Sequence, residues 1–341
     1  MINKESIKKI LIIKLRGIGD VVLSTIVLDN LRSDFPDAEI DYLTEAPSKP
    51  GLEGLPQINN VILLPKDFFQ RVKLIREIRR NCYDLVIDFY SNPATAQITF
   101  LSGAKYRAGF PYRGRKYAYN FFGPDKRNKV HSALLHLQML DAIGVSSTAY
   151  DLYYYVNEDD KSFVNYWLEN NSPKNHSLFG LSPSGGWNSK KCDPEKFAEI
   201  GLSISEKYNI KGLIVWGKSD YDDALKIKEL MGGKVFIAPA TTIRQMAAFI
   251  SECKFLIAND SGPMHISTAI GTPVLSLHGP TDPRLQGPFG AKHEWVNLDE
   301  LDCIMCNLLE CPINHECFKD LPVKRVLDKV ELLIKKNNIS I

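Results

Sequence analysis

Short apolar runs of strand length alternate with helical patterns along almost the whole chain, and this alternation limits the fold more than any other feature. Residues 10–15 form the first such run, and a helical pattern follows over 20–33. Further strand patterns occupy 39–44, 61–64 and 85–89. Strands separated by helices predict a parallel sheet that is covered on both faces. We therefore expect an α/β fold built on doubly wound sheets.

The alternation pauses after Asp151 and restarts at Leu178, which divides the chain into two parts. A length of 341 residues also predicts about two domains of roughly 150 residues each. The second part has strand patterns at 178–182, 213–216, 235–238, 255–258 and 274–277. We predict two Rossmann-like domains, 1–160 and 177–320, that join near 157–177. A ligand site is expected in the cleft between them, at the carboxyl ends of the strands.

The composition is that of a globular chain, with 44% hydrophobic and 24% charged residues. The densest apolar stretch, 10–28, is interrupted by Lys14, Arg16 and Asp20. No run therefore reaches the roughly 18 apolar residues that a transmembrane helix needs. The same stretch lacks the cleavage site of a signal peptide. We expect a cytosolic protein in a reducing environment.

The charge is almost balanced, with 42 Lys and Arg against 40 Asp and Glu, but the first part holds two strongly basic runs. A net charge of +2 predicts no general attraction to nucleic acid, and no nucleic-acid-binding motif accompanies it. One run shares a predicted helix with an apolar face made of Phe69, Val72, Ile75 and Ile78. The runs consist of Arg71, Lys73, Arg76, Arg79 and Arg80, and of Lys105, Arg107, Arg113, Arg115, Lys116, Lys126, Arg127 and Lys129. Such runs are either solvated faces or surfaces for an anionic acceptor or an anionic membrane.

The first strand pattern leads into a glycine turn, in which Gly17 and Gly19 precede Asp20. Two glycines let the backbone approach a ligand closely. The dinucleotide-binding fingerprint needs a third glycine where this chain has Val22, which disfavours an NAD-dependent oxidoreductase. Asp20 lies at the start of a helical pattern. It is either an N-cap residue or a carboxylate kept ionised by the helix end, which would suit a general base.

A helix start in the second part is suited to anions. Ser261, Gly262 and Pro263 follow a buried strand and open a helix, whose first turn offers free backbone N–H groups to a phosphate. His265 lies one turn along, where it either donates to a phosphate oxygen or packs as an ordinary helix residue. The turn 278–283 follows the next strand and is expected at the same edge.

A glycine-rich loop, 183–191, precedes another predicted helix and ends in Lys190 and Lys191. Pairs of surface lysines are usually solvated. The position of this pair, between a glycine-rich turn and a helix start, suits a phosphate contact equally well.

Four of the seven cysteines lie close together near the end of the chain, with the spacing C-x2-C-x4-C-x5-C: Cys303, Cys306, Cys311 and Cys317. In a reducing environment, thiols this close favour coordination of Zn or Fe over disulfides. The alternative is a loop of reduced cysteines, or disulfides that form on isolation. The segment 303–317 therefore either binds a structural metal or is a loop whose cysteines bind none.

Six motifs occur in a fixed order along nearly the whole chain. They are Lys14-Leu-Arg-Gly-Ile-Gly-Asp-Val21, Asp84-Leu-Val-Ile-Asp88, Arg107-Ala-Gly-Phe110, Lys190-Lys-Cys-Asp-Pro-Glu-Lys-Phe-Ala198, Asn259-Asp-Ser-Gly-Pro-Met-His265 and Gly279-Pro-Thr-Asp-Pro283. Each motif alone is weak, but the six in this order are specific. Together they resemble the glycosyltransferase family 9 heptosyltransferases, which build the inner core of bacterial lipopolysaccharide.

The resemblance implies a GT-B architecture, in which two Rossmann-like domains face a central cleft and a carboxyl-terminal helix, 321–341, packs back on the first domain. It implies that Asp20 is the catalytic base and that Lys190 lies beside the donor diphosphate. The residues implied for the donor nucleotide and its phosphates are Gly185, Gly186, Lys191, Asp260, Ser261, Gly262, His265, Gly279, Thr281 and Asp282. Those implied for the acceptor are Gly17, Gly19, Arg107, Arg113 and Arg115. Some members have hydroxyl residues where this chain has Gly185 and Gly186, and an aromatic residue at Cys192, so backbone amides are expected to bind more of the diphosphate.

We therefore expect an inverting glycosyltransferase that moves a heptose from ADP-heptose to an anionic, lipid-linked inner-core acceptor at the cytoplasmic face of the inner membrane. Lysine and backbone amides would supply the positive field, so no catalytic metal is expected. Two alternatives stay open: a family 9 relative that glycosylates a protein or another glycan, and a GT-B protein that only binds nucleotide sugar. The presence of both Asp20 and Lys190 argues against the second, because a binding protein needs no base.

Overall fold

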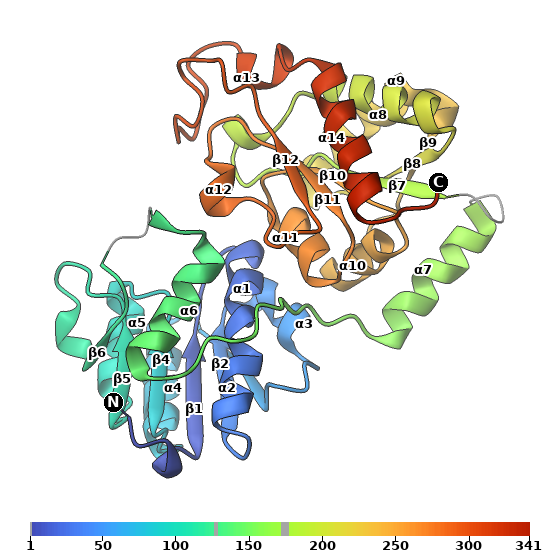
Figure 1. Ribbon diagram of the computed structural model, residues 1–341. Coiled ribbons are helices and arrows are strands. Elements are labelled where there is room, and N and C mark those ends of the chain that lie inside the picture. The colour runs from blue at the N-terminus through green and yellow to red at the C-terminus, as the bar shows by residue number, and fades with distance from the viewer. Residues whose placement is uncertain (1, 126–128, 172–176) are drawn as a thin grey trace. The chain divides into compact units, whose positions relative to one another are not determined.

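The computed structural model describes residues 2–125, 129–171 and 177–341, and the chain divides into two compact units, Met1–Tyr155 and Val156–Ile341. Among the described residues, the first unit contains one sheet of six parallel strands in the order β3-β2-β1-β4-β5-β6 (Figure 1). The strands are β1 (Lys9–Ile13), β2 (Glu39–Thr44), β3 (Asn60–Leu63), β4 (Leu85–Asp88), β5 (Tyr106–Gly109) and β6 (Phe121–Phe122). This is the strand order of a Rossmann-type fold.

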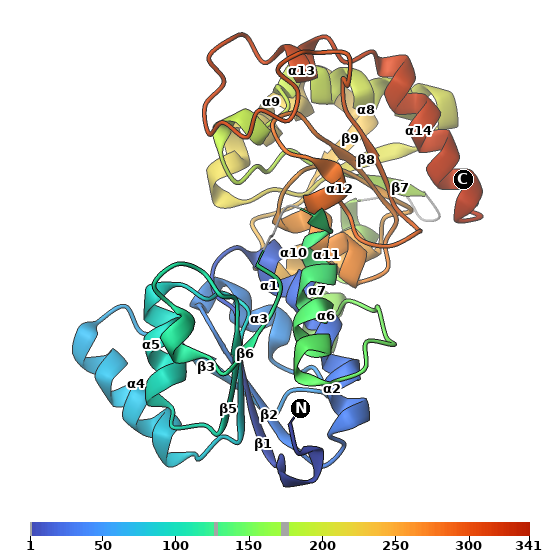
Figure 2. The same ribbon diagram turned by 60° about the vertical axis from the view of Figure 1, so that its left-hand side comes forward.

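Helices cover both faces of this sheet, as Figure 2 shows from a second side. Leu11 and Ile13 of β1 point to the same face, because side chains alternate along a strand, and they pack there against Leu74, Ile78 and Ile98. The helices of this face are α4 (Phe68–Arg80) and α5 (Pro93–Leu101). The other helices of the unit are α1 (Ile18–Ser24), α2 (Leu28–Asp34), α3 (Lys49–Leu52) and α6 (Ser132–Ile143).

The apolar face predicted for α4 is only partly correct. Ile78 is buried as expected, and Leu74 joins it, but Phe69 is 79% exposed and its neighbour Phe68 is 69% exposed. The two phenylalanines form the first turn of α4, which begins where the Asp67 side chain accepts a hydrogen bond from the backbone N–H of Gln70. Burial on this helix therefore starts one turn later than the sequence pattern suggests. Lys126 and Arg127 of the second basic run lie outside the described residues.

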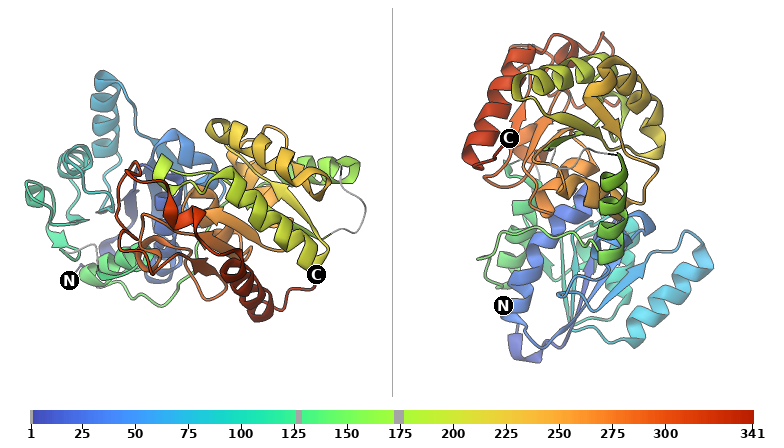
Figure 3. Two further views of the ribbon diagram at one scale, coloured as in Figure 1. Left: turned by 90° about the horizontal axis from the view of Figure 1, so that it is seen from above. Right: turned by 90° about the vertical axis from the view of Figure 1, so that its right-hand side faces the viewer.

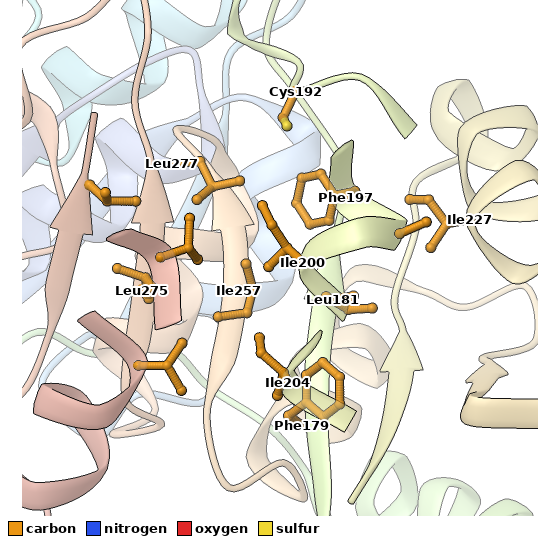
Figure 4. Packing of buried hydrophobic residues seen from close by; sticks show 14 of the residues in the cluster. Phe179, Leu181, Cys192, Phe197, Ile200, Ile204, Ile227, Ile257, Leu275 and Leu277 are labelled. Carbon is orange, nitrogen blue, oxygen red and sulfur yellow. The ribbon is translucent and has the colours of Figure 1, made fainter. Parts of the chain in front are cut away.

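Within the described ranges, the second unit repeats this plan with six parallel strands in the order β12-β11-β10-β7-β8-β9 (Figure 1). Figure 3 shows the ribbon from two further sides. Its strands are β7 (Leu178–Ser182), β8 (Lys211–Ile214), β9 (Val235–Ile237), β10 (Leu256–Asn259), β11 (Val274–Leu277) and β12 (Glu294–Val296). Its helices are α7 (Glu158–Asn171), α8 (Pro194–Tyr208), α9 (Tyr221–Met231), α10 (Ile243–Ser251), α11 (Gly262–Ala269), α12 (Pro283–Gln286), α13 (Glu316–Lys319) and α14 (Val323–Lys336). Figure 4 shows Phe197, Ile200 and Ile204 of α8 packed against the apolar side chains of the sheet.

The division between the units differs from the predicted one at two places. Residues 156–171 belong to the second unit, and most of the predicted join is the helix α7, which packs on α10 through the rings of Trp167 and Phe249, with centroids 5.3 Å apart. Residues 172–176 of that join lie outside the description. The carboxyl-terminal helix α14, predicted to pack on the first domain, buries Val326 and Val330 in the core of the second unit. None of the helices within the described ranges has the length and apolar character that a membrane span requires.

Candidate active site

The first unit places Asp20 at the edge of its sheet where the strands end. After Ile13 the chain turns through Arg16 and Gly17, both left-handed with φ of 58° and 65°, and enters α1. The Asp20 side chain is 58% exposed, and its Oδ1 lies 3.3 Å from Nζ of the buried Lys14. A Cβ on Gly17 would come within 2.8 Å of Asp20 Oδ2. The turn therefore presents a carboxylate that is held by a lysine and can accept a proton from a ligand.

The residues predicted for the acceptor are divided between two environments. Gly19 is buried in α1, and Arg113 and Arg115 follow the carboxyl end of β5, at the same sheet edge as Asp20. Arg107 lies inside β5, where its guanidinium donates to the backbone oxygens of Ala104 and Ala118. These bonds give Arg107 a structural role, and the geometry lends no support to its predicted contact with an acceptor.

In the second unit, β7 and β10 are neighbouring strands from which the sheet is extended in opposite directions. Ligands of doubly wound sheets bind at such a switch point, outside the carboxyl ends of the strands. The loop after β7 carries Lys190 and the loop after β10 begins with Asp260, and Lys190 Nζ lies 2.7 Å from Asp260 Oδ2. Both side chains are less than 10% exposed. Two residues predicted separately from the sequence therefore form one buried ion pair.

Asp260 has further partners that fix its charge. Oγ1 of Thr281 donates to Asp260 Oδ2 at 2.6 Å and lies 3.3 Å from Nδ1 of His278. Burial alone would raise the pKa of the Asp260 carboxyl, but the nearby His278 ring and the Lys190 ammonium group outweigh it and keep that pKa below its usual value. Burial lowers the pKa of His278 to about 4. The Lys190 ammonium group also lies 3.9 Å from the ring centroid of Trp187.

The start of α11 adjoins this ion pair in the sequence and in the fold. Ser261 is the N-cap residue, but its side chain makes no capping bond, and Pro263 occupies the first turn. The backbone N–H groups of a turn without a side-chain cap are suited to an anion, and the helix dipole favours negative charge there. His265 is buried one turn along the helix.

The loop 183–191 is attached to β10 by one buried side chain. Asn259 donates from Nδ2 to the backbone oxygen of Pro183 at 2.8 Å, and its Oδ1 accepts from the backbone N–H of Cys192 at 3.2 Å. The two bonds hold both ends of the loop, so the loop that carries Lys190 has a fixed base. Cys192 itself is a buried core residue.

The other predicted residues of this loop have unequal surroundings. A Cβ on Gly185 would meet the side chain of Lys191 at 2.5 Å, whereas one on Gly186 would meet open space. Lys191 Nζ lies 2.7 Å from Asp220 Oδ1 and 3.3 Å from Asp223 Oδ2. Burial would lower the pKa of Lys191, but these two carboxylates raise it above its usual value. Lys191 is thus engaged by acidic side chains of the protein.

The turn after β11, which is predicted to contact the donor, has a structural function. The Asp282 side chain accepts from the backbone N–H of Arg284 at 2.9 Å and pairs with its guanidinium at 2.7 Å, and these bonds keep the pKa of Asp282 below its usual value. A Cβ on Gly279 would lie 2.6 Å from Sγ of Cys317. Glycine is therefore needed here because the Cys-rich segment, residues 303–317, packs directly against the turn.

The Cys-rich segment is hydrogen-bonded to both loops of the candidate donor site. On one side, the backbone N–H groups of Met305 and Asn307 donate to the backbone oxygens of Gly279 and Pro280, at 3.0 and 2.7 Å. On the other side, Ser189 donates to the segment through its backbone N–H, to Leu309 at 3.2 Å, and through its hydroxyl group, to Leu308. The segment therefore connects the loop before α8 with the turn before α12.

All seven cysteines are free thiols. Burial raises the pKa of Cys317 to about 12, and the neighbouring Cys311, Cys303 and Cys306 add to this shift. No three His, Cys, Asp or Glu side chains in the described part of the chain are arranged as ligands of a metal ion.

Four residues of this arrangement were not identified from the sequence as parts of a site: Lys14, Trp187, Asn259 and His278. Lys14 carried a signal, because a charged residue at the end of an apolar strand is unusual unless it has a partner. Asn259 acts through Pro183 and Cys192, which are far away in the sequence. Trp187 and His278 contact residues three positions along, Lys190 and Thr281, but no motif marks these pairs.

Two Rossmann-type units of this kind, each with polar groups at the carboxyl edge of its sheet, have the GT-B architecture of glycosyltransferases. Solved structures support this assignment of the fold. A glycosyltransferase family 9 protein from Veillonella parvula gives a TM-score of 0.85 at 22% identity, over 96% of this chain and 97% of that one. The ADP-heptose lipopolysaccharide heptosyltransferase II of Escherichia coli gives a TM-score of 0.78 at 21% identity, over 97% and 99%.

The family is shown by the sequence. Residues 71–315 match the model of glycosyltransferase family 9 (heptosyltransferase). The chain is also 24% identical to lipooligosaccharide heptosyltransferase 2 of Campylobacter jejuni serotype O:2, over 94% of this chain and 97% of that protein. The chain belongs to glycosyltransferase family 9 and is a glycosyltransferase.

Proposed function

We propose that this enzyme transfers a heptose from ADP-heptose to an inner-core lipopolysaccharide acceptor, with inversion at the anomeric carbon. The observation that carries the proposal is the buried pair of Lys190 and Asp260 beside the start of α11, where a fixed cation would adjoin backbone N–H groups that are suited to a phosphate. The names of the similar proteins from Campylobacter jejuni and Escherichia coli support the choice of sugar and acceptor.

In the proposed reaction, the Asp20 carboxylate removes the proton of an acceptor hydroxyl group as its oxygen attacks the anomeric carbon. The bond from that carbon to the diphosphate breaks at the same time, and ADP leaves with the electron pair. Lys190 and the amides at the start of α11 stabilise the negative charge that develops on the diphosphate. Asp260 acts as a positioning residue, since it holds the Lys190 ammonium group in place without touching the reacting atoms.

The base assignment is tested with the variant Asp20→Asn. It should bind ADP as the wild type does, because the Asp20 side chain lies in the first unit, whereas transfer should fall by about a hundredfold or more, the range of a lost general base. Product formation from ADP-heptose and a truncated core acceptor is followed by mass spectrometry, and ADP affinity by calorimetry. Asp37→Asn, which changes an exposed carboxylate of the same unit, is the matched control.

Normal turnover of Asp20→Asn would contradict the base assignment. If the wild type consumes ADP-heptose but leaves the core acceptor unmodified, the acceptor part of the proposal is wrong. Transfer to a protein or to another glycan in the same experiment would then favour the alternative acceptor classes.

The proposal includes two further points. We expect the enzyme to act at the cytoplasmic face of the inner membrane as a peripheral protein, because its acceptor is lipid-linked. We also keep a structural Zn or Fe in the Cys-rich segment as a proposal, supported by the close spacing of four thiols on one short segment. Metal analysis of protein purified without chelators decides it, and a content far below one metal per chain counts against the site.

A further inference from the structure

Two adjacent aromatic side chains of the first unit are exposed without an evident structural reason. Phe68 and Phe69 are 69% and 79% exposed, and their ring centroids lie 5.7 Å apart in an edge-to-face arrangement. They stand at the first turn of α4, which Figure 2 shows at the margin of the first unit. Large apolar side chains that are exposed side by side usually mark a contact surface.

The rest of α4 surrounds this pair with positive charge. Residues 66–80 contain six cations against two carboxylates, Asp67 and Glu77. Phe69 shares one stripe of the helix with Lys73, Arg76 and Arg80, because residues spaced by four, seven and eleven positions lie on the same side. Leu74 and Ile78 occupy the opposite side and are buried. Exposed aromatic and cationic side chains therefore lie on the same outward face.

The cations of this face are largely available to a partner. Arg76 and Arg80 are exposed, and no ion pair or hydrogen bond of either side chain is found within the described ranges. Lys73 has a loose contact with Glu77, at 3.8 Å, and remains 78% exposed. A partner that binds this face must provide an apolar environment for the two phenylalanines and negative charge for the neighbouring cations. An anionic bilayer does both, because aromatic side chains insert at the level of the headgroups and cations bind the lipid phosphates.

We propose that Phe68, Phe69 and the cations of α4 form the surface by which the enzyme docks on an anionic phospholipid bilayer. The position within the first unit fits this role. Strand β3 runs parallel to β1 in the same sheet, so the chain leaves β3 toward α4 at the edge where it leaves β1 toward Asp20. Docking through this edge would bring the base toward the headgroup region, where a lipid-linked acceptor presents its sugars; this last step rests on the proposed function.

The test measures binding of the full-length protein to vesicles of phosphatidylcholine with and without phosphatidylglycerol, by co-sedimentation. The wild type should bind the anionic vesicles much more strongly. Phe68→Ser together with Phe69→Ser should lower this binding by about tenfold or more, and Arg76→Gln together with Arg80→Gln by about tenfold or more. Phe69→Trp should retain it, because tryptophan is equally suited to the interface.

Tyr166→Ser is the matched control, since Tyr166 is 71% exposed but lies on the acidic helix α7 of the second unit. It should bind as the wild type does, and unchanged thermal unfolding of all variants confirms that they are folded. Wild-type binding by the double Phe variant, or equal binding to neutral and anionic vesicles, would overturn the proposal. So would a change in the oligomeric state of the double Phe variant on gel filtration, because the face would then join copies of the chain.

The transfer assay separates this inference from the proposed function. The double Phe variant should glycosylate a lipid-free core acceptor at the wild-type rate and lose activity only on an acceptor embedded in vesicles. If the wild type glycosylates neither acceptor, the proposed function fails, and the vesicle measurements still decide the docking surface. Equal loss on both acceptors would overturn the docking surface, since the two phenylalanines would then act in the reaction itself.

Discussion

Gly17 is the residue on which the place of the Asp20 carboxylate depends most directly. Gly17→Ala would put a Cβ within 2.8 Å of Asp20 Oδ2 at a φ of 65°. The left-handed backbone should cost about 1–2 kcal/mol of stability. Displacement of the carboxylate should lower turnover by about tenfold to a hundredfold, with the ADP affinity unchanged. Steady-state kinetics and calorimetry measure the two effects.

Gly103→Ala is the control for this prediction. Gly103 has a similar φ of 74°, but a Cβ there would only touch Arg79 at an ordinary distance of 3.6 Å. This variant should show the loss of stability without the loss of turnover. Equal effects of the two variants on turnover would show that the contact with Asp20 does not matter.

His278 makes the stability of the second unit dependent on pH. Burial lowers its pKa from 6.5 to about 4 in the folded chain. Between these values the unfolded chain binds a proton that the folded chain does not, so stability is fully present above about pH 6.5 and falls as the pH drops toward 4. The loss at pH 5 should be about 2 kcal/mol. Urea unfolding of His278→Gln at pH 7 and pH 5 should show a pH dependence smaller by this amount, and an unchanged dependence would contradict the assignment.

The residues of the candidate donor site show which features of a site can be predicted from the sequence. Lys190 and Ser261 were identified because each lies in a local pattern, a glycine-rich loop or a helix start after a strand, whereas Asp260 was identified through the family resemblance. That Lys190 and Asp260 pair with each other, and that Thr281 joins them, follows from strand order, which brings loops distant in the sequence to one edge. The adjacent residues Lys190 and Lys191 could not be distinguished from the sequence. The fold shows that Lys191 pairs with Asp220.

At the scale of elements, the Cys-rich segment should support donor binding without touching the donor. Ser189→Ala removes the hydroxyl bond to Leu308 and loosens the loop that carries Lys190. One such bond contributes about 1 kcal/mol, so the affinity for ADP should fall by about fivefold. Calorimetric titration with ADP measures the change. Ser203→Ala, which removes a comparable hydroxyl bond to Glu199 on α8, should leave the affinity for ADP unchanged. An equal loss of affinity in the two variants would contradict a supporting role of the Cys-rich segment.

The elements themselves were predicted well where their patterns are locally complete. The strand patterns at 39–44, 178–182 and 274–277 coincide with β2, β7 and β11, because a short alternating or mostly apolar segment bounded by polar turns has few alternatives. The amphipathic pattern of α14 was equally clear. Amphipathicity predicts that one face of the helix is buried, but it does not predict which part of the protein covers that face. The helix lies on α8 and β12 of the second unit.

At the scale of the whole molecule, the two units have separate sheets and cores. A ligand that binds one unit should therefore change hydrogen exchange mainly within that unit. ADP should slow hydrogen exchange in the second unit, in 183–191 and 260–265, because it orders the amides of these loops. The protection should vanish in Lys190→Met, which removes the cation but keeps much of the side-chain volume. Mass spectrometry of peptides after exchange measures this, and unprotected loops in the presence of saturating ADP would contradict the assigned donor site.

The two-part division was available from the sequence because the alternation of strands and helices is interrupted once. The interruption did not determine the boundary, since the polar stretch after Tyr155 begins a helix, α7, whose Phe163 and Trp167 pack against Phe249 of α10. From the sequence pattern alone, such a helix is interpreted as a connection between two domains. Its assignment to the second unit depends on an aromatic contact between segments far apart in the chain.

The hydrogen bonds of the Cys-rich segment to Ser189 on one side and to Gly279 on the other have a consequence for genetics. A screen for loss of sugar transfer should recover substitutions in a stretch that holds no reacting group, and they would resemble defects of the donor site. A second change that restores the backbone of either loop could suppress them. Residues 303–317 would then be mapped as part of the active site by their phenotype, although they reach the donor only through the main chain of other loops.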